Sequence, residues 1–253
     1  MRRCFSKQIW VLKGVYLPLL LLCLLVSCGR GGKTYRIGMD PSWYPLPLHG
    51  KEANVYAFSN DLLVAISREE GVLFERVTVG WDNLIFGLKD KQYEGMLSSI
   101  TPRTFLEKAY TFSDPYLHTG PVLVVKAGRK VSAMNQMKGK EVAVDSLDTE
   151  ALLISHYPGI FVQYYNSIPE GLDDVISGTY DGILVNYIQA NSYLRDLYHG
   201  KVTMATPPLN EAGLRMVTLS GEHSELIDVF NSGLEKLRSS GKLEKLLKKW
   251  ELN

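Results

Sequence analysis

The chain has 253 residues, of which 45% are hydrophobic and 22% charged. This composition excludes a disordered chain, a collagen-like fibre and a protein with many membrane spans. Lysine and arginine number 28 against 27 acidic residues, and this balance, without any nucleic-acid-binding motif, argues against a nucleic-acid partner.

The first 27 residues are predicted to be a lipoprotein signal peptide. They carry four basic residues and no acidic one, and an apolar run extends from Val15 to Leu25. This run is shorter than a bilayer-spanning helix, which needs about 20 apolar residues. It ends in a small residue and a cysteine, an arrangement that resembles the bacterial lipobox: Leu25-Val26-Ser27-Cys28.

Cys28 is therefore the predicted lipidation site, with the signal cut just before it. Each buried methylene of an acyl chain such as palmitate contributes about 0.8 kcal/mol, so two or three chains anchor a domain stably. Residues 28–33 are rich in glycine and are predicted to form a flexible tether. We expect the mature protein in the periplasm or at the cell-envelope surface, attached to a membrane through its lipid. All three cysteines lie within residues 1–28, so the body has no disulfide and no thiol nucleophile.

From residue 35 onward, apolar β-rich runs alternate with amphipathic stretches of helical period. This alternation predicts an α/β fold with a mostly parallel sheet covered by helices, and it leaves open whether there is one sheet or two. The predicted strands are 35–39, 72–79, 93–97, 121–125, 141–145, 160–164, 181–185 and 213–219. The predicted helices are 61–68, 82–89, 149–157, 187–198, 223–238 and 242–250.

No enzyme signature is present. The chain lacks a P-loop, a nucleophile elbow, a zinc-protease motif and a dinucleotide-binding fingerprint. Its five histidines are widely scattered and predict no metal site. We therefore expect no catalytic residue, no metal and no cofactor.

Candidate binding residues follow the predicted strands. In open α/β sheets, ligands bind at the carboxyl ends of the strands. Asp40 and Trp43 follow the first strand among prolines, and Trp81 follows the second. A single tryptophan is usually packed in a core, but two beside the same sheet edge favour a stacking pair. The third strand is followed by small hydroxyl residues, namely Ser98, Ser99 and Thr101.

Several short motifs, taken in order, resemble the family 3 solute-binding proteins, the extracytoplasmic receptors of ABC importers for polar amino acids. The resemblance covers residues 35–253 and depends on the order and spacing of the motifs, because none is specific alone. The motifs include Tyr35-Arg36-Ile37-Gly38-Met39-Asp40, Ala57-Phe58-Ser59-Asn60-Asp61-Leu62, Trp81-Asp82-Asn83-Leu84-Ile85, Phe112-Ser113-Asp114-Pro115-Tyr116 and Lys249-Trp250.

The resemblance implies a type II periplasmic-binding-protein fold, in which two α/β lobes are joined by two crossover strands. The crossings are expected near 121–127 and 207–214. Lobe one would comprise residues 34–122 plus 212–253, and lobe two residues 123–211. A ligand would bind in the cleft between the lobes, which close on it.

The resemblance also implies roles for the candidate residues. Trp43 and Trp81 match the two aromatic residues that sandwich the ligand side chain. Asp40 matches a position that meets a distal cation in members with basic ligands. The hydroxyl residues Ser98, Ser99 and Thr101 match the cluster that holds the polar head of the ligand.

Three anchors that the family uses are altered here. Leu106 stands where an arginine grips the ligand carboxylate, and Asn186 stands where an aspartate meets the α-ammonium. A Gly-Thr pair of lobe two is replaced by Leu147-Asp148. The candidate ligand contacts in lobe two are Asp148, Thr149 and Asn186. Each lost charge-assisted hydrogen bond weakens binding by about 1.5–3 kcal/mol.

Arg103 is the candidate replacement for the missing arginine. Thr101 and Pro102 resemble a helix start, which would place Arg103 in a first turn, where the helix dipole disfavours a cation. A ligand carboxylate nearby would account for that placement. A surface ion pair with Glu107 explains it equally well.

The sequence thus predicts a monomeric, lipid-anchored binding protein that delivers an amino acid or a related small solute to an ABC permease. A modified amino acid, a short peptide or an amine are ligand candidates because of the altered anchors. Two alternatives stay open: an enzyme of the dehydratase kind on the same fold, and a sensor or surface lipoprotein without a transport role.

Overall fold

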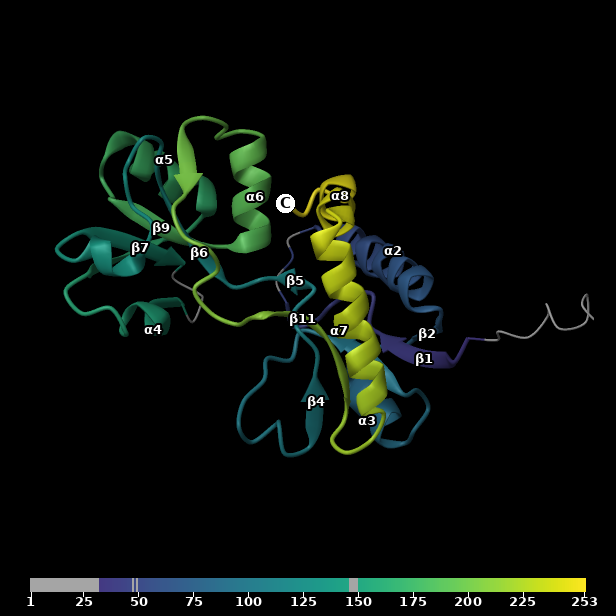
Figure 1. Ribbon diagram of the computed structural model, residues 1–253. Helices are drawn as coiled ribbons and strands as arrows, with labels where there is room; N and C mark the ends of the chain where they lie inside the picture. The colour runs from purple at the N-terminus through teal and green to yellow at the C-terminus, as the bar shows by residue number, and fades with distance from the viewer. Residues whose placement is uncertain (1–31, 47, 49, 146–149) are drawn as a thin grey trace, which may run out of the picture. The chain divides into compact units, whose positions relative to one another are not determined.

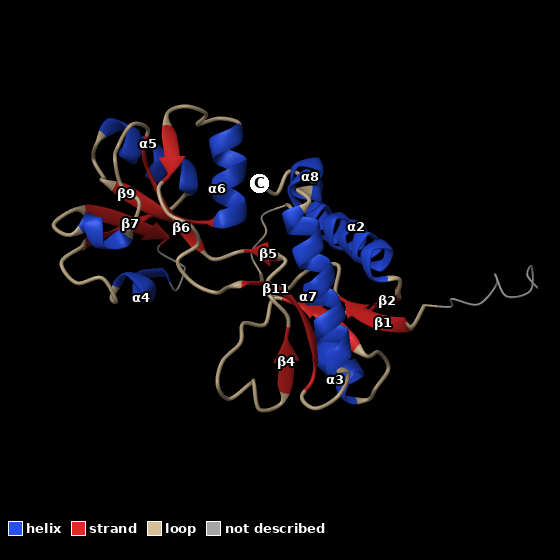
Figure 2. Ribbon diagram, in the orientation of Figure 1, coloured by secondary structure: helices blue, strands red, loops and turns tan. Residues whose placement is uncertain are grey.

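Strands and helices alternate along much of the chain, as the apolar periodicity predicts, but the strands between residues 95 and 126 follow one another without a helix between them. A computed structural model describes residues 32–46, 48, 50–145 and 150–253 (Figures 1 and 2). The predicted signal peptide, Cys28 and most of the tether lie outside these residues, and so do Leu147, Asp148 and Thr149. Residues 34–253 form one compact unit.

The first sheet combines strands from both ends of the described chain. Its order is β2-β1-β3-β11-β4, and the short β5 also pairs with β11. β1 is parallel to β2 and β3, whereas β11 is antiparallel to β3, β4 and β5. The strands are β1 (Thr34–Met39), β2 (Leu73–Thr78), β3 (Gly95–Ser98), β4 (Tyr110–Phe112), β5 (Leu117–His118) and β11 (Gly213–Leu219).

The two faces of this sheet follow from the alternation of side chains along its strands. Leu97 and Met216 lie in one core, which α2 (Glu52–Glu70), α7 (Ser224–Ser239) and α8 (Lys242–Lys249) also line. Their strand neighbours Met96 and Val217 lie in a second core, against α3 (Trp81–Lys89).

Helix α2 is longer than the predicted stretch 61–68. Val55 and Phe58 extend its buried face toward the N-terminus, so the helix begins at Glu52. It ends at Gly71, whose left-handed φ of 69° suits the residue after a helix, and whose N–H donates to the carbonyl of Ser67.

The second sheet has the order β10-β6-β9-β7-β8. β7 is parallel to β8 and β9, while β6 is antiparallel to both β9 and β10. The strands are β6 (Pro121–Lys126), β7 (Glu141–Asp145), β8 (Phe161–Tyr165), β9 (Gly182–Asn186) and β10 (Val202–Met204). One face packs against α5 (Ile168–Ser177) and α6 (Tyr187–Arg195), and the other against α4 (Glu150–Ile154) and the 3-10 turn η1 (Met134–Met137).

Two expectations need correction. The sheets are mixed rather than mostly parallel, because each crossover reverses the direction of a strand. The sequence analysis also sets no bounds for α5, although its start carries a signal. Ser167 caps the helix by accepting from the N–H of Glu170, whose carboxylate accepts from the N–H of Asn166.

The chain crosses between the two sheets twice, which confirms the two-lobe fold. It leaves the first sheet after β5 and returns to it at β11. The crossing segments are hydrogen-bonded to each other: Thr119 N–H donates to the carbonyl of Ala212 (3.0 Å), and Leu209 N–H to that of Pro121 (2.9 Å). The first crossing was expected near 121–127. Pro121–Lys126 instead form β6, a strand of the second sheet, and the crossing lies just before it. The lobe boundaries given above stay a prediction.

Leu184 provides a test of the second core. Its side chain is fully buried in β9, so Leu184→Ala is expected to lower the free energy of unfolding by about 2–5 kcal/mol. Leu197→Ala is the matched control, because Leu197 is 70% exposed and its loss should change stability by no more than about 0.5 kcal/mol. Urea denaturation measures both, and equal losses would contradict the packing described.

Candidate functional site

The carboxyl ends of β1 and β3 and the start of α3 meet around a narrow cavity in the first lobe. Its walls lie so close together that it has no room for a water molecule. Five of the residues that line it were predicted from the sequence to lie at the site, namely Asp40, Trp43, Trp81, Ser98 and Ser99. The lining residues are Asp40, Trp43, Tyr44, Trp81, Leu84, Leu97, Ser98 and Ser99.

Local hydrogen bonds hold the polar side chains of this cavity. The Asp40 carboxylate, on a residue only 4% exposed, accepts from the backbone N–H of Ser42 (3.0 Å) and from the Ser42 hydroxyl (2.7 Å). The Ser98 hydroxyl oxygen accepts from the N–H of Ile100 (3.2 Å). These bonds fix the orientation of both groups.

The two predicted tryptophans have different surroundings. Trp43 is only 2% exposed and packs in the core with α2 and α7. Trp81 is partly exposed, and the ring beside it is that of Tyr44, with centroids 5.9 Å apart in an edge-to-face arrangement. Tyr44 is 61% exposed. The sequence analysis missed it, although it adjoins Trp43 among the same prolines.

The segment after β3 differs from the prediction. Residues 104–109 form turns rather than a helix, with the N–H groups of Leu106 and Glu107 both donating to the carbonyl of Arg103. Thr101 and Pro102 therefore start no helix, and the helix-dipole argument for Arg103 was wrong. Leu106 packs against the α3 core.

Arg103 is exposed and, within the part of the chain that the structure describes, makes no ion pair with Glu107. Thr101 is a partly exposed loop residue. The ligand contacts assigned to Thr101 and Arg103 stay predictions.

Asn186 has a structural role at the end of β9. Its amide nitrogen donates to the carbonyl of Thr119 (2.6 Å), and its amide oxygen accepts from the N–H of Ile188 (3.1 Å). Asn186 thereby caps α6 and ties that helix to the first crossing segment.

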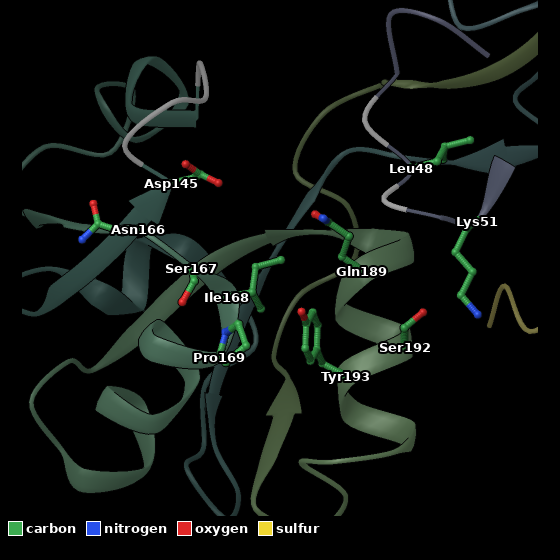
Figure 3. A pocket seen from close by; sticks show the side chains of 10 residues that line it. All are labelled: Leu48, Lys51, Asp145, Asn166, Ser167, Ile168, Pro169, Gln189, Ser192 and Tyr193. Atoms are coloured by element: carbon green, nitrogen blue, oxygen red, sulfur yellow. The ribbon is translucent and has the colours of Figure 1, made fainter. Parts of the chain in front are cut away.

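A larger pocket of about 390 Å³ lies beside the second sheet (Figure 3). It is lined by the end of β7, the start of α5, one side of α6 and the segment before α2. Its residues are Leu48, Lys51, Asp145, Asn166, Ser167, Ile168, Pro169, Gln189, Ser192 and Tyr193.

Lys51 is the cation of this lining, and its ammonium group pairs with the carboxylate of Glu251 at 3.0 Å. The hydrogen bond from Lys51 holds the pKa of Glu251 below its ordinary value. The same carboxylate lies 3.4 Å from the guanidinium of Arg195 in α6.

Among the described residues, no group of three or more histidine, cysteine, aspartate or glutamate side chains could hold a metal ion. In the same residues, no helix combines the length and the apolar character that crossing a membrane requires.

Residues 35–253 match the bacterial extracellular solute-binding proteins, family 3. The chain belongs to this family. An arginine-binding extracellular protein of Bacillus subtilis (strain 168), ArtP, is 29% identical over 237 residues, covering 89% of this chain and 92% of the relative. The L-cystine-binding protein TcyJ of Escherichia coli (strain K12) is 24% identical over 221 residues, covering 86% and 82%.

A solved structure supports the fold of this solute-binding protein. The L-cystine solute receptor of Neisseria gonorrhoeae, in its unliganded open conformation, matches with a TM-score of 0.68 and 19% identity, covering 89% of this chain and 96% of the receptor. The two-lobe architecture expected from the sequence is confirmed.

The burial of Trp43 and the exposure of Tyr44 can be separated by mutation. Trp43→Ala is expected to lower the free energy of unfolding by about 3–5 kcal/mol, because it empties a core position. Tyr44→Ala is expected to cost less than about 1 kcal/mol, since it removes a mostly exposed ring and one aromatic contact. Urea denaturation of both variants tests this order, and a larger loss for Tyr44→Ala would refute it.

Proposed function

We propose that this solute-binding protein captures an amino acid or a related small solute between its two lobes and delivers it to an ABC permease. The observation that carries the proposal is the set of groups gathered around the narrow cavity at the strand ends of the first lobe. It combines a buried carboxylate, serine hydroxyls and an aromatic pair within one lining. Such a combination suits a small ligand with both polar and apolar parts.

The aromatic pair of this proposal is Tyr44 and Trp81. Both rings line the cavity, and both present surface that a ligand side chain could cover. Trp43, which the resemblance assigns to the sandwich, would support the loop from inside the core. Aromatic faces accept apolar chains, planar groups and cations. A cation over an aromatic ring contributes about 0.5–2 kcal/mol to the free energy of binding.

The proposed ligand is cationic. Asp40 supplies a carboxylate in the first lobe, while Leu106 offers no charge for a ligand carboxylate. The relative of Bacillus subtilis is described as arginine-binding, and a relative of Pseudomonas aeruginosa as an L-arginine-binding protein. A basic amino acid, or an amine that lacks the carboxylate, fits this set of groups.

Delivery would depend on closure of the lobes. A ligand favours the closed state only through contacts that it gains there. In this proposal it contacts strand ends of both lobes at once, and the closed pair of lobes is what the permease recognises.

We also propose that the mature protein is a monomer held at a membrane by lipid on Cys28. The support is the order of a basic start, a short apolar run and a small residue before the cysteine. A soluble domain tethered by residues 28–33 would stay beside its permease and keep its freedom to rotate.

A thermal-shift panel tests the function. L-arginine, L-lysine, L-histidine, L-cystine, agmatine and putrescine would be added to the purified domain, with D-glucose as the control. A ligand at a hundredfold excess over its Kd stabilises by about 2.7 kcal/mol, so at least one compound should raise the Tm by several degrees. No shift with any member of the panel would refute the proposal.

The anchor is tested by Cys28→Ser. The variant is expected to leave the membrane fraction, because it cannot accept the lipid. Cys4→Ser and Cys23→Ser are matched controls that should fractionate as the unmodified chain does. Membrane association of Cys28→Ser equal to that of the controls would exclude the anchor.

A further inference from the structure

Asp145 occupies the middle of the ligand-facing edge of the second lobe. It is the last residue of β7, and β7 lies between β9 and β8 in the sheet. These three strands are mutually parallel, so their carboxyl ends share one edge. Asn186 ends β9 on one side of Asp145, and Asn166 follows β8 on the other.

The strand alternation places Asp145 on the side of the sheet that α5 and α6 cover. Val142 and Val144 lie in the core with α4, whereas Ala143 lies in the core with α5 and α6. Asp145 shares the side of Ala143, because residues two apart on a strand point the same way. It accordingly lines the larger pocket together with Gln189 and Tyr193 of α6 (Figure 3).

Asn186 is poorly suited to hold a ligand cation. It is neutral, and both ends of its amide are already used, one by Thr119 and the other by Ile188. A rotation toward the cleft would leave the start of α6 without its cap, at a cost of about 1 kcal/mol.

The charge of the pocket favours a cation. Among its described lining residues, Asp145 is the one acid and Lys51 the one base. Lys51 is paired with Glu251, which lies outside the lining, so its charge is largely compensated. The pocket therefore presents the carboxylate of Asp145 with the uncharged polar groups of Gln189, Ser192 and Tyr193.

We propose that Asp145 holds a cationic group of the ligand, an ammonium or a guanidinium, in place of the carboxylate that Asn186 lacks. Asp145 already interacts with other atoms of this chain. An ionised carboxylate has about four acceptor sites, so a ligand can join that interaction without displacing it. The inference rests on the proposed function, because it names a residue for the solute that the cleft captures.

With Asp40 in the first lobe, the cleft then carries one carboxylate on each side. Closure on a ligand with two cationic groups would satisfy both carboxylates at once. This favours basic amino acids and diamines over acidic amino acids, whose second carboxylate would face Asp40 or Asp145.

The test is isothermal titration calorimetry of Asp145→Asn with L-arginine, L-lysine, agmatine and putrescine. The variant should bind the compounds that the unmodified protein binds at least tenfold more weakly. Asp228→Asn is the matched control, because Asp228 is exposed on α7. The affinity of this variant for the same compounds should equal that of the unmodified protein. Asn186→Ala should lower the Tm and change affinity by less than Asp145→Asn does.

Gln189→Lys is a second, independent test in case Asp145→Asn does not fold. Gln189 is half-buried on α6, where a lysine can be accommodated, and the added cation should also weaken binding at least tenfold. The role of Asp145 would be overturned if folded Asp145→Asn or folded Gln189→Lys kept the affinity of the unmodified protein. It would also be overturned if Asn186→Ala lost more affinity than Asp145→Asn, and in either case the proposed function would still hold. If the unmodified protein binds none of the four compounds, the cationic ligand itself is refuted.

Discussion

The pairing of the two crossing segments is the constraint on which the binding site depends. Residues 119–121 and 209–212 bond to each other through their backbones, and β5 continues the pairing into β11. A buried arginine reinforces this region, because the Arg215 guanidinium, 6% exposed, donates to the carbonyls of Ser113 and Glu211 (2.9 Å each). Any closing motion of the lobes must turn about these bonded segments.

Strand direction then decides which residues meet a ligand. The parallel strands of each sheet end at one edge, and the polar side chains of the site follow those ends. The polar groups at these ends are held by short-range bonds, as Asp40 is by Ser42 and Ser98 by the N–H of Ile100. Buried polar groups without such partners are costly, and the indole nitrogen of Trp43, in the same lining, is buried without one among the described residues.

The altered anchors show how one position can pass from binding to structure. Asn186 stands where the family meets an ammonium, and here it caps α6 and holds the first crossing segment. Leu106 stands where the family grips a carboxylate, and here it contributes to the core beside α3. Both residues thus contribute to the fold, and in our proposal the charges offered to a ligand are those of Asp40 in one lobe and Asp145 in the other.

The sequence alone determined most of the succession of strands and helices, because apolar periodicity records which faces are buried. It did not indicate the short strands β4, β5 and β10 or the bounds of α5. It did indicate Asp40, Trp81, Ser98 and Ser99, since each follows a predicted strand and strand ends are where such sheets bind ligands. Only the tertiary structure decided that Trp43 is buried and Tyr44 exposed, because adjacent residues of a loop have no fixed period. It likewise decided that 104–109 are turns and that Asp145 shares a pocket with α6, since pairing between distant segments leaves no local pattern.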